Sequence, residues 1–468
     1  MLREREPLGS FSWNRTMKNF FRRKTSYKKY LWYIPFGLVL MVGVYYLPPV
    51  QSRLAWRVDE LYARIKYYFN PPDQAVFLPA QTDDFETNLT TARAQYWLTL
   101  TPAVTETPTP TPGVTFTPTI TTTPLPGSVA LSGVKYETQS GRNNYCGPTN
   151  FSMALTFWGW KGNRSVLGDA LMPGNRLDKV GKAGDNDKNV MPYEFQDYIA
   201  ENVPGITSAL RYGGDLDALK RLIAGGFPVI AERGIYERDM LGKMGWMGHY
   251  QFVTGYDDAK REVIVQDSYV SGPNFHVDYD EFMNAWREFN YLFLVVYPGE
   301  REREVVDLLG TLADPVAAAR IALERANQEA VTLTGNDQFW AAFNVGTSHV
   351  ALHEYVDAAY AYDNAFGLYS ELSSDMTSRP YRVMWYQTGP YFAYYYANRF
   401  SDVINLASTT LNDTISKPIL EESLLWRGRA YYMLGDTQSA IKDYRAALKV
   451  HVNWTLAIQA LQELGIKP

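Results

Sequence analysis

The stretch that decides the fold is Q-S-G-R-N-N-Y-C-G-P-T-N-F-S-M-A-L, residues 139–155. A polar turn containing Gly and Pro leads into an apolar run, which predicts a helix over residues 151–158. Cys146 then lies at or just before the amino end of this helix. There, free backbone N–H groups and the helix dipole favour a thiolate over a thiol. Cysteines with a purely structural role more often lie within apolar runs.

Cys146 is the one cysteine of the chain. A single cysteine excludes a disulfide within the chain and any zinc site built from several cysteines. Its thiol is therefore either inert packing or a reactive group, and the residues around it have to decide between the two.

Two stretches further along the chain supply partners for a reactive thiol. H-Y-Q-F-V-T-G-Y (249–256) and E-V-I-V-Q-D (262–267) predict two strands of a hairpin. In an antiparallel hairpin the start of the first strand lies beside the end of the second, so His249 and Asp267 become neighbours. A nucleophilic cysteine needs a base and a third group that orients it. We predict Cys146 as the nucleophile, His249 as the base and Asp267 as the orienting group; the alternative is a core histidine and a turn aspartate.

Other residues of the same region are candidates for supporting roles. Gln139 lies seven residues before the cysteine, and its amide is a candidate donor to an oxyanion together with the backbone N–H of Cys146. The alternative for Gln139 is an exposed loop residue. Asp187 and Asn189 are candidates to line the cleft, or else they belong to a solvated turn.

Three further histidines offer alternative roles. His276, which follows the hairpin, is a rival base to His249. His349 and His353 are four residues apart on a predicted helix and could share a metal ion, but no third ligand is evident. We interpret this pair as ordinary surface residues, and we expect no metal and no organic cofactor.

Residues 128–298 read as an α+β domain. Besides the elements above, the pattern predicts helices at 191–201 and 216–224 and strands at 227–232 and 291–297. The strand candidates are rich in β-branched and aromatic residues and are bounded by Gly, Pro or Asp.

Residues 299–468 read as an all-α region of helical repeats. The clearest unit is residues 426–448, W-R-G-R-A-Y-Y-M-L-G-D-T-Q-S-A-I-K-D-Y-R-A-A-L. Its small and large packing residues recur as in tetratricopeptide repeats, whose stacked pairs form a solenoid. They are Gly428, Tyr431, Leu434, Gly435, Ala440, Tyr444 and Ala447. A second copy aligns on Gly346, Leu352, Tyr355, Ala358, Tyr362 and Ala365, and a degenerate third on Tyr391, Tyr394, Asn398 and Val403.

The first 127 residues divide by composition into four segments. Residues 1–29 form a basic head with nine Lys or Arg, predicted to be cytoplasmic, and the charge-free run 30–47 predicts a single transmembrane helix. Residues 48–100 then form an extracytoplasmic stalk. Residues 101–127 contain eleven Thr and seven Pro and predict an extended linker. We expect a single-pass protein of the cell membrane whose later domains are extracytoplasmic.

Overall composition restricts the class of protein. The chain has 468 residues, of which 46% are hydrophobic and 20% charged, so disorder throughout is excluded. The formal net charge of -5 makes nucleic acid an unexpected partner. The length suggests two to four domains.

The motifs of residues 128–298 carry a resemblance. Q-x6-C-G-P-T, then G-H-Y-x-x-V-T-G-Y-D, then Q-D-S-Y resemble the papain-like cysteine peptidases of the bacteriocin-leader-processing family. They are most similar to its stand-alone peptidase C-thirty-nine-like domains in bacterial surface proteins. The resemblance implies Cys146 as nucleophile, His249 as base, Asp267 as orienting residue and Gln139 as oxyanion donor. A Walker A pattern is absent from the sequence, so the exporter function of the best-known relatives is not implied.

Together these observations predict a multidomain, membrane-anchored, extracytoplasmic cysteine peptidase. It would cleave an amide bond of a peptide or protein, and its helical repeats would bind the substrate or a protein partner. Two alternatives stay open: a catalytically silent, tethered peptide-binding scaffold, and a murein amidase or acyl transferase with the same triad.

Overall fold

The structure is a computed structural model of the whole chain. It describes residues 33–45, 61, 65–66, 68–69, 76–79, 124–140, 142, 144–172, 188–238, 244–269, 271–373, 379–413 and 420–468. The chain divides into two compact units. Helix α3 (Tyr33–Tyr45) belongs to the first, and the elements described below belong to the second.

Helix α3 corrects the prediction of a transmembrane helix over residues 30–47. It has thirteen residues, so it is about 20 Å long, whereas the hydrocarbon core of a bilayer is about 30 Å thick. Pro35 lies in its first turn, where a helix tolerates the missing N–H, so α3 begins close to this residue. Within the part of the chain that the structure describes, no helix has both the length and the apolar character needed to cross a membrane. The predicted transmembrane helix was therefore wrong.

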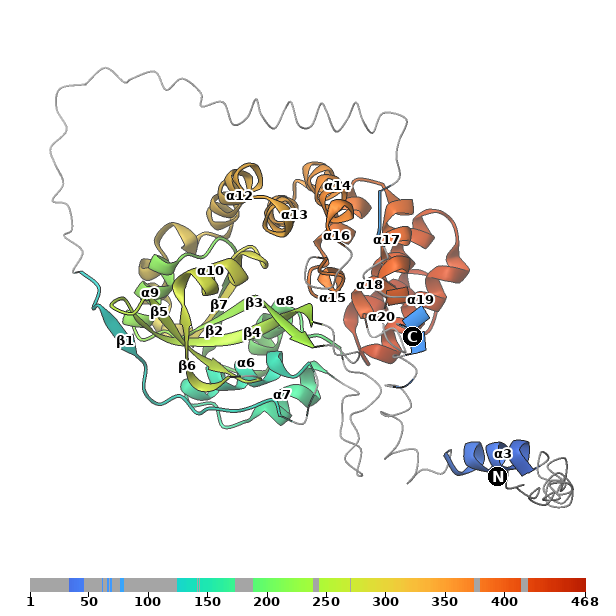
Figure 1. The fold of residues 1–468 in the computed structure, drawn as a ribbon, viewed down its shortest axis with the longest axis horizontal. Helices are drawn as coiled ribbons and strands as arrows, with labels where there is room; N and C mark the ends of the chain where they lie inside the picture. Colours follow the sequence, from blue (N-terminus) through green and yellow to red (C-terminus); the bar gives the residue numbers. More distant parts are fainter. Residues whose placement is uncertain are drawn as a thin grey trace, which may run out of the picture. The chain divides into compact units, whose positions relative to one another are not determined.

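A seven-stranded antiparallel sheet organises the α+β domain (Figure 1). Its strands run in the order β2-β7-β3-β4-β5-β6, and β1 pairs with β4. The strands are β1 (Ser128–Ala130), β2 (Ile206–Arg211), β3 (Val229–Arg238), β4 (Met244–Asp257), β5 (Glu262–Asp267), β6 (Gly272–Asp278) and β7 (Phe293–Pro298). The long strand β4 at the centre carries His249.

Helices cover both faces of this sheet. One core contains Phe151, Phe195, Phe252 and Leu294 and joins one face to α6 (Cys146–Phe157), α7 (Arg164–Leu171) and α8 (Pro192–Asn202). The other core joins the opposite face to α9 (Leu216–Ala224), α10 (Tyr279–Arg287) and α11 (Glu302–Leu309), with Trp286 at its centre. Side chains alternate between the two faces of a strand, so both faces of β4 are buried.

The predicted α+β class of this domain is confirmed, and its predicted elements correspond closely to observed ones. The hairpin of 249–256 and 262–267 is β4–β5, and the predicted helices 191–201 and 216–224 are α8 and α9. The helix after the cysteine begins five residues earlier than predicted, at Cys146. Strands β1, β2 and β6 and helices α7 and α10 were not predicted.

The C-terminal region is helical, as predicted. This region starts with two short 3₁₀ turns around α11: η2 (Gly299–Arg301) precedes the helix and η3 (Gly310–Ala313) follows it. The helices that follow are α12 (Pro315–Thr332), α13 (Gly335–Ala351), α14 (Tyr355–Glu371), α15 (Val383–Tyr386), α16 (Gly389–Tyr396), α17 (Phe400–Asp413), α18 (Glu421–Met433), α19 (Thr437–Val450) and α20 (Thr455–Glu463).

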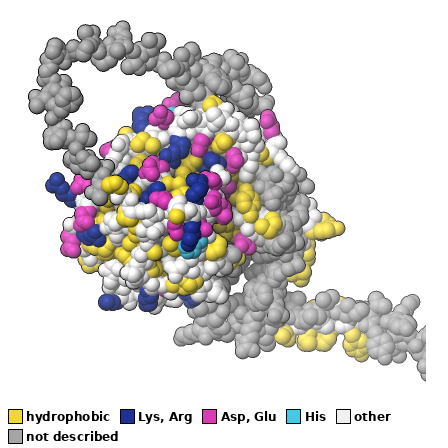
Figure 2. Space-filling model, turned by 60° about the vertical axis from the view of Figure 1, so that its left-hand side comes forward, with side chains coloured by type: hydrophobic (Ala, Val, Ile, Leu, Met, Phe, Trp, Pro, Cys, Tyr) yellow, Lys and Arg dark blue, Asp and Glu magenta, His cyan; other side chains and the backbone are white. Residues whose placement is uncertain are grey.

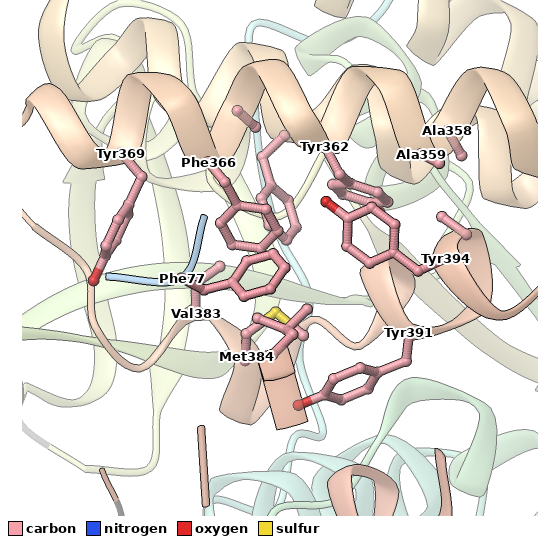
Figure 3. Close-up of a cluster of buried hydrophobic side chains, with 14 of the residues drawn as sticks. Phe77, Ala358, Ala359, Tyr362, Phe366, Tyr369, Val383, Met384, Tyr391 and Tyr394 are labelled. Atoms are coloured by element: carbon pink, nitrogen blue, oxygen red, sulfur yellow. The ribbon is translucent and has the colours of Figure 1, made fainter. Parts of the chain in front are cut away.

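Aromatic side chains fill the core of this helical region (Figure 3). Phe77, from a short segment that the sequence analysis placed in the stalk, lies among them. Its ring makes an edge contact with Phe366 at 5.0 Å between centroids and lies 6.0 Å from the ring of Tyr394. The Phe77 side chain is thus packed into the helices, whereas Leu78 beside it is exposed.

The α+β domain and the helical region share a buried interface. Trp246 of β4 packs against Trp340 of α13, with ring centroids 4.7 Å apart, and stacks on Phe289 at 5.6 Å. Tyr386 of α15 meets the same indole edge-on at 5.7 Å. One hydrophobic core therefore crosses from the sheet into the helices.

An ion cluster lies at another point of this interface. Lys188 is fully buried, and its Nζ lies 2.8 Å from Glu194 Oε2 in α8 and 3.0 Å from Glu421 Oε1 in α18. Beside it the hydroxyl of Tyr193 donates to Glu422 Oε1 at 2.6 Å. These contacts tie the amino ends of α8 and α18 together.

The outer surface of the second unit mixes both signs of charge. The face drawn in Figure 2 carries Lys and Arg side chains interspersed with Asp and Glu, and hydrophobic side chains lie between them. That face is unlike the basic stripe with which proteins bind nucleic acid.

Close packing of helix pairs in the C-terminal region gives a first testable prediction. A Cβ at Gly428 of α18 would lie 2.6 Å from Tyr444 Cε1 in α19, so Gly428→Leu should overpack this contact. We expect the free energy of unfolding of the full chain to fall by about 1–3 kcal/mol, measured by urea denaturation.

Gly367→Leu in α14 is the matched control for this substitution. A Cβ at Gly367 meets nothing within 4 Å. This variant should keep or slightly raise the stability, because leucine favours a helix more than glycine does. Equal stability of the two variants would mean that the α18–α19 contact is misplaced.

Candidate active site

The candidate nucleophile stands at the start of a buried helix. Cys146 is the first residue of α6, its side chain is partly exposed, and Tyr145 precedes it as the cap residue. A Cβ at Gly147 would lie 3.0 Å from Val190 Cβ, so the chain after the cysteine passes tightly beside residues 188–191. The thiol thus lies at the positive end of the helix dipole.

The candidate base and its orienting group meet as neighbours on the sheet. His249 Nε2 lies 3.2 Å from Asp267 Oδ1, and both residues are buried, with 2% and 4% of their surface exposed. The side chain of Cys146 is the other hydrogen-bonding group that raises the pKa of His249. Since Nε2 is engaged by Asp267, Nδ1 is the ring nitrogen left for a bond with a thiol.

An irregularity in the hairpin puts these two side chains on one face. Asp257 pairs with Glu262 and Gly255 with Ile264, but Val253 pairs with Val265, so one extra residue of β4 lies between the two registers. Continued from Val253, the second register sets Asp267 opposite Gln251, which shares its face of β4 with His249. Without the bulge Asp267 would lie opposite Phe252, on the other face.

Glycine at position 255 is required next to this bulge. A Cβ there would lie 2.6 Å from the carbonyl oxygen of Val129, on the strand β1 that pairs with β4. The close approach of β1 thus fixes the place where the register of β4 changes.

Asn150 connects the three elements that carry the candidate triad. Its Nδ2 lies 2.9 Å from the carbonyl oxygen of Cys146, 2.8 Å from that of Tyr250 and 3.1 Å from Ser268 Oγ. Tyr250 and Ser268 directly follow His249 and Asp267 in the chain. Asn150 is fully buried, so these bonds fix the amino end of α6 against β4 and the end of β5.

Gln139 joins the same network. Its backbone N–H donates to the carbonyl oxygen of Ser268 at 2.7 Å, and Ser268 Oγ donates to Gln139 Oε1 at 3.0 Å. Through Ser268 and Asn150 it is linked to the backbone of Cys146. The side chain is buried rather than a free loop residue, and its oxygen is the end of the amide that Ser268 holds.

The electrostatics of the site favour a charged His249–Asp267 pair. Burial opposes the charged imidazolium, but the hydrogen bonds with Asp267 and Cys146 outweigh it and raise the pKa of His249 to about 9. Burial likewise opposes the Asp267 carboxylate, but His249, the Tyr269 N–H and Gln251 bring its pKa down to about 2. Between these values the pair holds one positive and one negative charge.

A second carboxyl group borders the site without joining this pair. Glu232 of β3 is buried, and burial, reinforced by the charge of Cys146, raises its pKa well above the usual range. It pairs across the strands with Tyr250, whose hydroxyl hydrogen-bonds to it. The surroundings of Glu232 thus favour the protonated form of its carboxyl group.

The raised pKa of His249 predicts how stability depends on pH. The pKa is above the unfolded value of 6.5, so the charged ring stabilises the fold fully below pH 6.5 and loses that effect as the pH rises to about 9. The shift corresponds to about 3 kcal/mol. We expect wild type to lose about this much stability relative to His249→Gln between pH 6 and pH 9.5, measured by urea unfolding. A constant difference between the two proteins would contradict the assignment.

The helical region borders this site through α15. A Cβ at Gly248, directly before His249, would lie 2.7 Å from the ring of Tyr386, and Arg382 Nη1 donates to the carbonyl oxygen of Trp246. On the other side Asn189 Nδ2 donates to the carbonyl oxygen of Trp385 at 2.9 Å. Helix α15 therefore contacts both the strand that carries His249 and the loop beside Cys146.

Other residues singled out in the sequence lie elsewhere or contact other groups. Asn189 contacts α15 as described, and Asp187 lies outside the described residues. His276, the rival base, is on β6 and pairs with Glu262 at 2.9 Å. His349 Nδ1 lies 2.7 Å from Glu354 Oε2, and Glu354 and Asp357 are the acidic groups near it.

Three buried residues of the site were missed in the sequence. Asn150 and Gln251 are polar residues inside a helix and a strand, and Glu232 is an acidic residue in the apolar run F-P-V-I-A-E. A polar residue within a predicted buried element is the signal that could have found them, since such groups need buried partners.

Comparisons with known proteins agree with the predicted resemblance for part of the chain. Residues 131–293 match the model of the Peptidase_C39 like family. In a protein from Bacillus anthracis, designated a C39-like peptidase, 97% of the chain aligns with 36% of this one, at 16% identity and a TM-score of 0.29. No curated protein matches the chain. The family match supports a C39-like, papain-like peptidase domain over residues 131–293.

Proposed function

We propose that the chain is a cysteine peptidase that hydrolyses an amide bond of a peptide or protein. The observation that carries the proposal is the buried pair of His249 and Asp267, with Nε2 3.2 Å from Oδ1, which Asn150 ties to the amino end of α6 where Cys146 lies. The family match over residues 131–293 supports the same reaction class.

The mechanism follows from these roles. The Cys146 thiolate attacks the carbonyl carbon of the amide, and His249 gives its proton to the leaving amine as the C–N bond breaks. The acyl group is then held as a thioester. His249 takes a proton from water, the hydroxide attacks the thioester, and the carboxylic acid leaves while the thiolate is restored. Asp267 stabilises the imidazolium, which exists before the proton passes to the amine and again after His249 has taken a proton from water.

The oxyanion of each tetrahedral intermediate needs hydrogen-bond donors. We assign this role to the backbone N–H of Cys146 and the amide nitrogen of Gln139. Ser268 Oγ donates to the amide oxygen of Gln139, so the nitrogen is the end of that side chain available to a substrate.

We propose that the helical region contacts a bound peptide. Helix α15 touches the loop beside Cys146 and the strand that carries His249, so a chain bound across the two meets Tyr386 and its neighbours. We further propose that α13–α14 and α18–α19 are tetratricopeptide-type helix pairs. Supporting this, a Cβ at Gly346 or Gly428 would meet the ring of Tyr362 or Tyr444 on the partner helix at 2.6–2.8 Å.

The test is release of peptides that depends on one sulfur atom. Wild-type protein is incubated with a complex mixture of unfolded proteins and peptides, and new amino termini are identified by mass spectrometry. We expect a consistent set of cleavage sites, absent when Cys146 has first been alkylated with iodoacetamide. Since Cys146 is the one cysteine, the reagent blocks no other thiol of the chain. Fast alkylation of Cys146 without any cleavage would favour acyl transfer. If neither fast alkylation nor cleavage were observed, the peptide-binding scaffold would be the remaining interpretation.

A further inference from the structure

Both oxygens of Asp267 are held by the protein. Oδ1 accepts from the backbone N–H of Tyr269 at 2.8 Å in addition to His249, and Oδ2 accepts from Gln251 Nε2 at 3.1 Å. Gln251 is 3% exposed and lies two residues after His249 on β4. Residues two apart on a strand share a face, so His249 and Gln251 of β4 both hydrogen-bond to the carboxylate of Asp267 from the same side of the sheet.

The orientation of the Gln251 amide is itself fixed. Arg233 Nη1 donates to Gln251 Oε1 at 3.3 Å. A guanidinium only donates, so it can bind only the oxygen of the amide. The nitrogen must then face Asp267.

The sheet supplies this arginine from the other side of β4. Arg233 pairs with His249 in the register of β3 and β4, so its side chain starts on the face that carries the base. It is 7% exposed, and its Nη2 lies 3.5 Å from Glu281 Oε1 on α10. The guanidinium is held between α10 and the candidate site.

We propose that Gln251 is a positioning residue of the peptidase, which holds the Asp267 carboxylate so that Oδ1 stays on His249, and that Arg233 keeps the Gln251 amide in the required orientation. This inference rests on the proposed function. Without the Gln251 bond, Oδ2 would be a buried carboxylate oxygen with one donor fewer, and the carboxylate could turn away from the imidazole. Asp267 would then stabilise the imidazolium less, and a smaller fraction of Cys146 would be ionised at a given pH.

Two substitutions of Gln251 test the proposal in different ways. Gln251→Met keeps the length of the side chain and removes both hydrogen bonds of the amide, the one to Asp267 and the one from Arg233. Gln251→Glu places a second carboxylate beside Asp267, and two carboxylates in one buried site share a proton, so the imidazolium loses part of its partner's charge. The readout is the rate of Cys146 alkylation by iodoacetamide across pH 5–10 in the full chain. We expect about a tenfold slower reaction at pH 6 for either variant, equal to a shift of one pH unit in the profile.

Gln266→Glu is the matched control. Gln266 is 2% exposed and directly precedes Asp267, but its amide bonds to Thr254 and Asn274 on the opposite face of β5. This variant buries an equal charge next to the site and should leave the pH profile unchanged, even where it lowers the melting temperature.

The possible outcomes separate this inference from the function on which it rests. A wild-type profile like that of an ordinary thiol overturns the proposed function, whatever the variants do. An activated wild type with unchanged profiles in both Gln251 variants overturns the positioning role alone, as does an equal shift in Gln266→Glu. If Gln251→Glu does not fold, Gln251→Met decides in the same way. Slow alkylation confined to the Gln251 variants supports the proposal.

Discussion

Replacing His249 with alanine should slow the alkylation of Cys146 at pH 6 by about a hundredfold. An ordinary thiol is well under 1% ionised at that pH, since its unperturbed pKa is about 8.5. In the proposed mechanism the His249 imidazolium, bound to Asp267 at 3.2 Å, stabilises the thiolate. The measurement is the rate at which iodoacetamide alkylates Cys146, and no other thiol of the chain competes for the reagent.

The same substitution should remove catalysis as well as reactivity. Without the imidazole no group gives a proton to the leaving amine, so hydrolysis of any cleaved peptide should fall about a thousandfold or more. Asp267→Asn should have a smaller effect on the alkylation rate, because Asp267 acts on the thiol only through His249.

His276→Ala is the matched control for His249→Ala. His276 also lies on a strand of the sheet beside a carboxylate, Glu262, but it is partly exposed. This variant should keep the wild-type rates. If His276→Ala were slow and His249→Ala normal, the assignment of the base would be reversed.

The second large effect concerns stability. Lys188→Met should lower the free energy of unfolding by about 3–5 kcal/mol, because it leaves two carboxylates buried without their counter-charge. Lys188 Nζ lies 2.8 Å from Glu194 and 3.0 Å from Glu421, and these carboxylates raise its pKa despite its burial. Urea denaturation of the full chain at pH 7 measures the loss.

Lys220→Met shows what an ordinary ion pair contributes. Lys220 Nζ is also 3.0 Å from a carboxylate oxygen, that of Asp258, but the pair is solvent-accessible. Such pairs contribute about 0–1 kcal/mol. A loss in Lys188→Met no larger than that of Lys220→Met would mean that the cluster does not join α8 and α18 in solution.

The parts of the fold that follow from local pattern were predictable from the sequence. The β4–β5 hairpin was predicted from alternating and β-branched residues bounded by Asp257 and Asp258, and this alone put His249 near Asp267. The helical C-terminal region followed from the periodic small residues around Gly428. In each case the pattern lies within one continuous stretch of the sequence and needs no information about distant residues.

The features that depend on distant parts of the chain were not predictable in the same way. The bulge that turns Asp267 onto the face of His249 depends on Gly255 meeting β1, a strand from far earlier in the chain. Asn150 has partners on α6, on β4 and after β5. Lys188 reads as a solvated loop residue until Glu421 is placed beside it.

The prediction of a transmembrane helix failed for a different reason. The absence of charge from Tyr30 to Leu47 gives the length of the apolar stretch. It does not show where a helix begins, because a helix beyond its first turn also needs the backbone N–H that proline lacks. With Pro35 in the first turn and thirteen residues in the helix, α3 is shorter than the apolar run that contains it.

The contact of Trp246 with Trp340 limits where the chain can be cut into separate fragments. A fragment ending at residue 298 keeps the seven-stranded sheet and the whole family match, yet it strips Trp246 and Phe289 of their aromatic neighbours on α13 and α15. Large rings facing water beside the strand of His249 favour aggregation. We therefore expect the α+β domain of this chain to need α13 and α15 as neighbours: separated from them, it exposes Trp246 and Phe289 to solvent.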